Sequence, residues 1–207
     1  TGVGASFAGN SEYDPSSGTA ALTVNKRNLT VTATGIDKVY DGTTAATVTL
    51  GDNRVAGDTL TVGYTSAAFD NENVGTGKTV NVSGISVSGE DAGNYTLTNT
   101  TAVTTANITK RELTVTAAAA NKTYDGTTAA AVTLGDNRVE GDTLTVGYTS
   151  ASFDTKNIGT GKTVTVSGIS ISGADAGNYT LTSNTALTTA NITKRDLTLG
   201  AEGVDKP

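Results

Sequence analysis

An internal repeat of 84 residues limits the folds open to this chain more than any other feature. The segment Lys-Arg-Asn-Leu-Thr-Val begins at Lys26, recurs as Lys-Arg-Glu-Leu-Thr-Val at Lys110, and starts again as Lys-Arg-Asp-Leu-Thr-Leu at Lys194. Residues 26–109 align with residues 110–193 without a gap, and 66 of the 84 positions are identical. Self-similarity at a fixed period is typical of tandem arrays. We call residues 26–109 repeat 1 and residues 110–193 repeat 2, and expect both to share one fold.

The two flanking segments resemble parts of the same repeat. Residues 1–25 end in Ala-Leu-Thr-Val-Asn, and we interpret them as the tail of a preceding, diverged repeat. Residues 194–207 begin with the first-strand pattern, so we interpret them as the start of a following repeat. The chain is therefore expected to be a slice of a longer array.

Apolar and polar residues alternate within each repeat, which is typical of half-buried strands. In repeat 1 the alternating runs are Leu29–Ala33, Val48–Leu50, Leu60–Tyr64, Val80–Val82, Ile85–Val87, Tyr95–Leu97 and a run ending at Ile108. Turn residues separate these runs, among them Gly75–Gly77. The pattern predicts an all-β fold of small antiparallel sandwich-like domains, either immunoglobulin-like or β-grasp-like, arranged end to end. A single helical turn is expected, near Ser66–Phe69 or Glu90–Gly93.

The join between the repeats, Ile108–Val115, contains no Gly, Pro or Ser. One strand is expected to run almost directly into the next, which leaves few dihedral angles free and makes the join stiffer than a Gly/Ser linker. Each repeat also has a thin apolar core, so neighbouring units should stabilise one another through their junctions. The sequence therefore predicts a rod.

The composition argues against most enzyme chemistry. The chain contains no Cys and no His, so it has no thiol nucleophile, no imidazole base and no imidazole or thiolate metal ligand. We expect no catalytic residues, no cofactor and no enzymatic activity. The net charge of −6 disfavours binding to nucleic acid, which requires clusters of Lys and Arg. No run of 18 apolar residues occurs, so membrane insertion is not expected.

Two loops of repeat 1 are rich in oxygen ligands, the loop with Asp70 and Glu72 and the pair Glu90 and Asp91. Calcium prefers six to eight such ligands. The repeats disagree at these positions, because Glu72 is replaced by Lys156 and Glu90 by Ala174 in repeat 2. We therefore interpret these loops as solvated turns, assign no metal site, and expect calcium to matter little.

The pattern Asp-x-Gly-x-Tyr occurs at Asp91, Gly93 and Tyr95, and again at Asp175, Gly177 and Tyr179. This spacing is similar to the tyrosine corner of immunoglobulin-like domains, in which a tyrosine hydroxyl bonds to nearby backbone. We expect both tyrosines to be buried and structural.

A lysine–asparagine crosslink is an alternative that the sequence leaves open. Lys38 precedes Asp41 by three residues, and Asn107 lies near the end of the same repeat. Such a crosslink requires a buried carboxylate and tight geometry.

Several ordered motifs together resemble one family of repeats. They are the Leu-Thr-Val-Thr-Ala strand from Leu29, the sequence Tyr-Asp-Gly-Thr-Thr, and an ending of Gly-Asn-Tyr-Thr-Leu-Thr followed by Ala-Asn-Ile-Thr-Lys-Arg. The central motif comprises Tyr40, Asp41 and Gly42 in repeat 1, and Tyr124, Asp125 and Gly126 in repeat 2. The set resembles the YDG-type repeat, which is related to MBG repeats. These repeats occur in tandem in large secreted bacterial adhesins similar to filamentous haemagglutinin, which are exported by two-partner secretion.

The resemblance implies a structural stalk of a biofilm-matrix adhesin, secreted to the bacterial cell surface or extracellular matrix. Such a stalk would project or link adhesive regions in cell–cell or matrix adhesion, and the full-length protein would contact exopolysaccharide or a cell surface. The family supplies no catalytic residues, and a monomeric rod is expected. The alternative is an exopolysaccharide- or glycan-binding module, although the chain contains no Trp and three Phe, and sugar sites typically use exposed aromatic rings.

Overall fold

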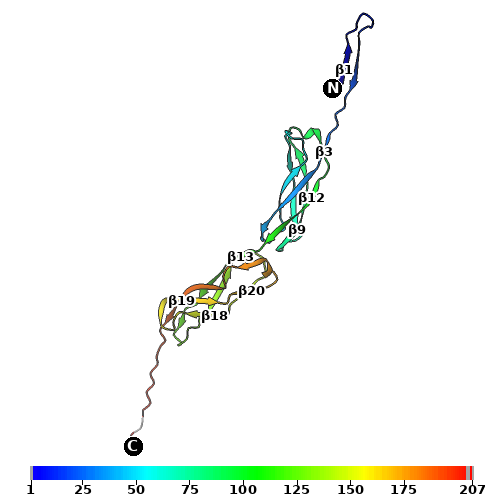
Figure 1. The fold of residues 1–207 in the computed structure, drawn as a ribbon. Helices are drawn as coiled ribbons and strands as arrows, with labels where there is room; N and C mark the ends of the chain where they lie inside the picture. The colour runs from blue at the N-terminus through cyan, green and yellow to red at the C-terminus, as the bar shows by residue number, and fades with distance from the viewer. Residues whose placement is uncertain (1, 204–205, 207) are drawn as a thin grey trace. The chain divides into compact units, whose positions relative to one another are not determined.

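The computed structural model describes residues 2–203 and 206, and the fold of these residues is built from short strands (Figure 1). In repeat 1 the elements are β3 (Arg27–Leu29), β4 (Val31–Ile36), β5 (Lys38–Val39), β6 (Thr47–Asp52), β7 (Thr61–Gly63), β8 (Ser66–Phe69), β9 (Gly75–Ser83), β10 (Ser86–Ser88), the 3₁₀ turn η1 (Ala92–Asn94), β11 (Tyr95–Leu97) and β12 (Thr101–Thr109). In repeat 2 they are β13 (Arg111–Leu113), β14 (Val115–Ala119), β15 (Lys122–Thr123), β16 (Val132–Asp136), β17 (Thr145–Gly147), β18 (Ser150–Phe153), β19 (Gly159–Ser167), β20 (Ser170–Ser172), η2 (Ala176–Asn178), β21 (Tyr179–Leu181) and β22 (Thr185–Thr193).

The two repeats have the same strand pairing, which confirms the all-β fold and its tandem duplication. Each repeat contains a four-stranded sheet, ordered β5-β12-β9-β8 in the first copy and β15-β22-β19-β18 in the second. The registers also correspond, because Ser66 lies opposite Ser83 and Ser150 lies opposite Ser167. Each residue of the second pair lies one repeat length, 84 residues, after its counterpart in the first pair. This is expected, because identical side chains impose the same register.

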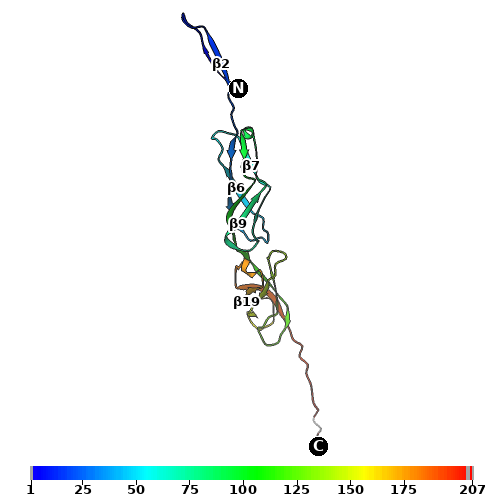
Figure 2. The ribbon, with the colours of Figure 1, turned by 90° about the vertical axis from the view of Figure 1, so that its right-hand side faces the viewer.

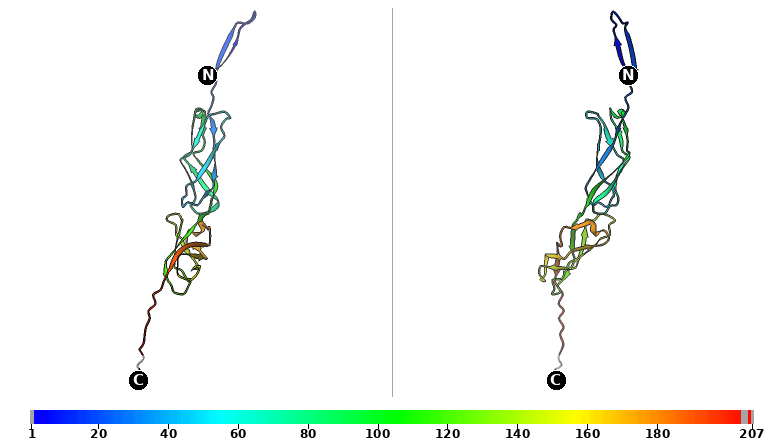
Figure 3. Two further views of the ribbon diagram at one scale, coloured as in Figure 1. Left: turned by 90° about the vertical axis from the view of Figure 1, so that its left-hand side faces the viewer. Right: turned by 45° about the vertical axis from the view of Figure 1, so that its right-hand side comes forward.

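The core of repeat 2 lies between two layers of strands. The four-stranded sheet contributes Phe153, Val164, Ala190 and Ile192, all of them buried. The two-stranded sheet of β14 and β16 covers them with partly buried residues such as Val132. Figure 2 labels β19 in this repeat and β9 in repeat 1, and Figure 3 shows the same ribbon from two further directions. Alternating side chains thus bury one face of each layer and leave the other face exposed.

A second, smaller core lies at the end of each repeat where the chain enters. In repeat 1 it consists of Leu29, Leu60 and Tyr95. Strand β3 pairs with β11 in parallel, which brings the first strand of the repeat beside Tyr95. Strand β13 pairs with β21 in the same way in repeat 2.

The structure corrects three details of the sequence prediction. Ser66–Phe69 forms strand β8, which pairs with β9, so the first of the two predicted places for a helical turn is wrong. The second place, Glu90–Gly93, is confirmed, because the 3₁₀ turn at Ala92–Asn94 overlaps it. Gly75–Gly77 does not form a turn between strands, since β9 begins at Gly75. Two pairings in each repeat are parallel and not antiparallel: β3 with β11 and β5 with β12 in repeat 1, and β13 with β21 and β15 with β22 in repeat 2.

The join between the repeats is short, as the sequence predicts. Strand β12 ends at Thr109, β13 begins at Arg111, and Lys110 alone lies between them. Ile108 and Leu113, on either side of the join, are both buried. The chain thus passes from the last strand of repeat 1 to the first strand of repeat 2 through one residue.

Spatial contacts divide the chain into two compact units that do not coincide with the repeats. The second unit contains Asp37–Thr44 and Asp70–Lys78, two loops of repeat 1, together with the chain from Ala106 onward. The remaining residues form the first unit. The two loops therefore make their contacts mainly with the unit that contains repeat 2.

The flanking segments differ from the repeats. The hairpin of β1 (Gly2–Phe7) and β2 (Ser16–Ala21) is antiparallel and exposed along its whole length. Residues 194–203 form neither helix nor strand. Among the described residues, no helix is long and apolar enough to cross a membrane.

Candidate functional site

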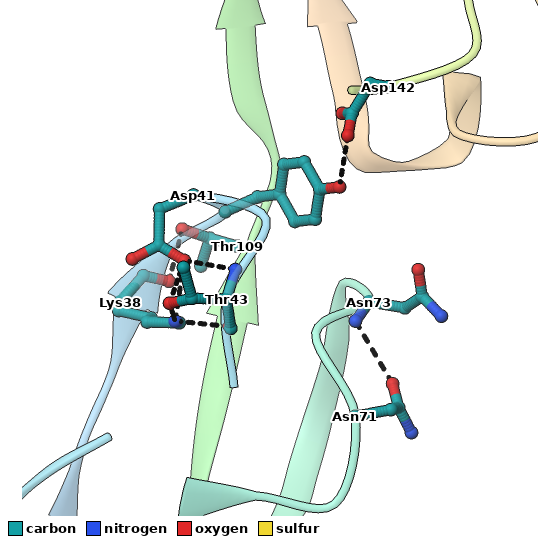
Figure 4. A network of polar contacts seen from close by, with 8 residues as sticks. Lys38, Asp41, Thr43, Asn71, Asn73, Thr109 and Asp142 are labelled. Atoms are coloured by element: carbon teal, nitrogen blue, oxygen red, sulfur yellow. Dashed lines mark hydrogen bonds and ion pairs between the residues drawn. The ribbon is translucent and has the colours of Figure 1, made fainter. Parts of the chain in front are cut away.

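The Tyr-Asp-Gly motif of repeat 1 lies in a loop that hydrogen bonds from a lysine hold in place. The Lys38 Nζ, on β5, donates to the Asp41 carboxylate at 2.7 Å and to the Thr43 carbonyl at 2.7 Å. Asp41 also accepts hydrogen bonds from the backbone N–H and the hydroxyl of Thr43, each at 2.9 Å. Figure 4 shows these three side chains around the loop. The loop is thereby fixed on both sides of Gly42, whose φ of +75° is strained for other residues.

Repeat 2 forms the same loop. The Lys122 Nζ binds Asp125 at 2.9 Å, and Thr127 donates its backbone N–H to the same carboxylate. These hydrogen bonds, that from Lys122 first, lower the pKa of Asp125 to about 2. The carboxylate therefore remains ionised throughout the physiological range and holds the loop closed.

The loop that Lys38 holds in place also positions the ring of Tyr40. The Tyr40 N–H donates to the Thr109 carbonyl at 2.9 Å, and only 2% of the residue is exposed. Its hydroxyl donates to the Asp142 carboxylate at 3.1 Å, and its ring meets the ring of Tyr179 edge to face, with centroids 5.6 Å apart. The Tyr179 hydroxyl donates to the second oxygen of Asp142 at 2.5 Å. One carboxylate thus accepts hydrogen bonds from both tyrosines.

A second contact joins the neighbouring loop of repeat 1 to the 3₁₀ turn of repeat 2. The Asn178 side-chain oxygen accepts a hydrogen bond from the Val74 N–H at 3.0 Å, and its amide group donates to Asn73 at 3.2 Å. Asn178 is 5% exposed. A buried amide requires such partners, and here they come from the other repeat. Together with the tyrosine pair, this contact forms what we call the junction cluster: Tyr40, Asn73, Val74, Asp142, Asn178 and Tyr179.

Tyr95 and Tyr179 occupy equivalent corners. Both are buried, and each hydroxyl accepts a hydrogen bond at 2.9 Å from a backbone N–H, that of Val55 or that of Val139. This is the burial and backbone bonding that the Asp-x-Gly-x-Tyr spacing predicts. Each hydroxyl also donates to a carboxylate, Asp58 or Asp142, which the motif does not indicate.

The aspartate of the corner motif does not accept the tyrosine hydroxyl but bonds to backbone. Asp91 accepts a hydrogen bond from the Thr59 N–H at 2.8 Å, and Asp175 accepts one from the Thr143 N–H at 2.8 Å. These bonds join η1 and η2 to the loop that precedes β7 or β17. Gly93 and Gly177 lie within the two 3₁₀ turns.

The lysine and asparagine of the crosslink hypothesis form hydrogen bonds with different partners. Asn107 donates its side-chain amide to Asp37 at 2.8 Å and accepts from the Gly77 N–H at 2.8 Å, whereas Lys38 binds Asp41 and Thr43. In the oxygen-rich loop, Asp70 is paired with the Lys78 ammonium at 3.0 Å. Among the described residues, no group of three or more acidic side chains is placed to hold a metal ion.

The junction cluster is thus a set of polar groups that satisfy one another across two stretches of chain. Its chemical capacity is to hold two loops of repeat 1 against residues of repeat 2 through hydrogen bonds, within the second compact unit. Sequence reasoning identified Tyr40 and Tyr179 as motif residues but missed Asp142 and Asn178. One signal was present, since both residues are identical to their counterparts 84 positions earlier, Asp58 and Asn94.

The environment of Tyr40 predicts a loss of stability at alkaline pH. Burial, and then the hydrogen bond to Asp142, raise the pKa of Tyr40 to about 12 from its ordinary value of 10. The folded chain therefore holds this proton more tightly than the unfolded chain does. The stabilisation is complete below pH 10 and is lost as the pH rises to about 12. Urea unfolding at a series of pH values should show this decline, and Tyr40→Phe should make it shallower. An identical pH dependence with and without Tyr40 would contradict the assignment.

Comparison with known proteins supplies one match. A family model described as the YDG domain matches residues 25–102 and again residues 109–186. No curated protein and no solved structure matches the chain. The two matched ranges begin one residue before the repeats defined by internal identity, and together they cover most of the chain.

Proposed function

Because the chain belongs to the YDG domain family and carries two tandem copies of the domain, we propose that it is a stalk segment of a secreted bacterial adhesin. In this proposal the segment projects or links adhesive regions in cell–cell or biofilm-matrix adhesion. It is not an enzyme, and it acts at the bacterial cell surface or in the extracellular matrix. Exopolysaccharide or a cell surface is contacted by the full-length protein, which is exported by two-partner secretion.

The junction cluster is the observation that carries this proposal. A stalk holds its far end at a fixed distance only if each unit is restrained relative to the next. A flexible linker would not provide this restraint. Here a single residue separates β12 from β13, and loops of repeat 1 bond to Asp142 and Asn178 of repeat 2. Both restraints support a stiff junction. The excess of acidic residues also supports the proposal, because self-repulsion disfavours side-by-side collapse.

A glycan-binding module is the competing proposal. Its support is the exposure of two tyrosine rings, those of Tyr13 and Tyr148. Exposed aromatic rings can stack on sugars. The two rings belong to different parts of the chain, one to the hairpin loop and one to repeat 2, so they do not by themselves define a platform.

Small-angle scattering tests the stalk proposal on this chain. We expect an elongated particle with a narrow range of maximum dimension. A matched variant with a Gly/Ser spacer inserted after Lys110 should broaden that range, because the spacer removes the short join. A compact profile, or one as broad for the native chain as for the spacer variant, would reject the stiff stalk. Either result would favour the glycan-binding alternative, which a pulldown with matrix polysaccharide would then examine.

A further inference from the structure

Each repeat carries both halves of the junction cluster. We call the half on the loops the tyrosine face, which consists of Tyr40, Gly42, Asn73 and Val74 in repeat 1, and of Tyr124, Gly126, Asn157 and Ile158 in repeat 2. The half on the opposite end is the acceptor face, which consists of Val139, Asp142, Asn178 and Tyr179 in repeat 2, and of Val55, Asp58, Asn94 and Tyr95 in repeat 1. Only Val74 and Ile158 differ between the copies. The chain thus contains one engaged pair of faces and one further copy of each.

The tyrosine face is more exposed in repeat 2 than in repeat 1. Tyr40 is buried, whereas Tyr124 is half-buried. Val74 is half-buried, whereas Ile158 is 49% exposed. At Gly42 an added Cβ would lie 2.8 Å from the Val139 side chain, but at Gly126 it would meet no atom within 4 Å. The residues of this face in repeat 2 therefore lack the cover that repeat 1 receives.

The acceptor face shows the same difference in the opposite copy. Asn178 is buried between loops, whereas Asn94 is exposed. Val139 is half-buried, whereas Val55 is 46% exposed. Asp142 accepts hydrogen bonds from the hydroxyls of Tyr179 and Tyr40. Asp58 accepts the equivalent of the first bond, from Tyr95, so the bond from Tyr40 is what distinguishes Asp142. Identical side chains thus change burial according to whether a complementary face is present.

The segment after repeat 2 also differs from its counterpart after repeat 1. Leu197 is the counterpart of Leu113, which is fully buried, yet it is 85% exposed. Arg111–Leu113 forms β13 by pairing with β21, whereas residues 195–197 pair with no strand in the described chain. A shallow pocket lies between Tyr124 and residues 195–198. At the equivalent place beside Tyr40 and Arg111 stands the ring of Tyr179.

We propose that the tyrosine face of repeat 2, together with residues 195–197, is a docking surface for a further YDG unit. The unit that fits presents Asp, Asn and Tyr at the positions of Asp142, Asn178 and Tyr179, and it accepts residues 195–197 as its first strand. Its tyrosine fills the pocket beside Tyr124, and its carboxylate accepts the hydrogen bond of the Tyr124 hydroxyl. The inference deepens the proposed stalk function and rests on it, because an array grows only if each added unit docks in this way.

Tyrosine nitration tests the docking surface directly, because it reads the exposure of individual rings by mass spectrometry. In the present chain, Tyr124 should be modified and Tyr40 should be protected. A copy of residues 114–193 is then joined after Leu197, so that residues 194–197 complete a third unit. We expect the nitration rate of Tyr124 to fall about tenfold, which corresponds to about 1.4 kcal/mol of docking free energy.

A blocking variant provides the matched control. In the added unit, the counterpart of Val139 is changed to Arg, at a position that is exposed when no neighbour docks, as Val55 shows. The arginine should obstruct contact with Gly126 and restore nitration of Tyr124. The inference is overturned if Tyr124 stays reactive in the three-unit chain while the added copy of Tyr179 is protected and the added unit is therefore folded. It is also overturned if the arginine fails to restore reactivity. Scattering on the two-unit chain tests the stalk separately, so the two failures are distinguishable.

Discussion

Replacement of Asp142 by Ala is expected to destabilise repeat 2 by about 2–4 kcal/mol, because two tyrosine hydroxyls lose their shared acceptor. Tyr179 donates to one carboxylate oxygen at 2.5 Å and Tyr40 to the other at 3.1 Å, and both rings are buried. A buried hydroxyl left without a partner costs about 1–3 kcal/mol. Hydrogen exchange of peptides from β21 and β22 would measure the loss within this repeat.

Asp58→Ala is the matched control for this prediction. Asp58 accepts a hydrogen bond from the Tyr95 hydroxyl at 2.5 Å but, within the described part of the chain, has no counterpart of the Tyr40 bond, so its removal should cost about 1–2 kcal/mol. Asp142→Asn retains one acceptor oxygen and should lie between the wild type and the alanine variant. Equal losses for the two alanine variants would mean that the bond from Tyr40 contributes nothing to stability.

Gly89→Ala is expected to cost about 3 kcal/mol or more, the largest effect of any substitution proposed for repeat 1. Gly89 has a φ of +118°, and a Cβ at this position would lie 2.5 Å from the Thr59 carbonyl oxygen. The obstacle is backbone, which cannot rotate away as a side chain can. The loop before β7 would have to move, and it carries the Thr59 N–H that binds Asp91.

Gly93→Ala separates this effect from a general intolerance of alanine. Gly93 is exposed, its φ is not positive, and an added Cβ would meet no atom within 4 Å. Thermal unfolding followed by circular dichroism should therefore show a large fall in Tm for Gly89→Ala and little change for Gly93→Ala. Comparable values of Tm for the two variants would contradict the steric argument.

The sequence predicts strands well where one face is buried, because alternation reports burial directly. The runs around Val80 and Tyr95 formed strands where expected. The sequence does not predict the strand at Ser66–Phe69, which was one of two candidate places for the helical turn, because its small residues give no clear period and only pairing with β9 makes it a strand. The parallel pairing of β3 with β11 was missed for a related reason, since alternation marks a strand but does not identify its partner.

The candidate site could be predicted only in part. Local spacing identified Tyr95 and Tyr179 as buried corners, because the motif and its backbone partner lie in one domain. Asp142 lies 102 residues from Tyr40, and no local pattern links them. The internal repeat does preserve both residues in each copy, but identity over most of a repeat cannot separate residues that form the core from residues that face the next unit.

The direction of the last strand has a mechanical consequence. Strand β22 is one of the longest in repeat 2, and it pairs with β19 on one side and β15 on the other. A pull on the chain beyond Thr193 acts along this strand, and its hydrogen bonds lie across the line of force. Such a load shears many bonds at once, whereas a pull perpendicular to the strand would open them one after another. Tension along the chain would thus be carried by the ladder as a whole, so that the repeat resists extension until the ladder fails in a single step.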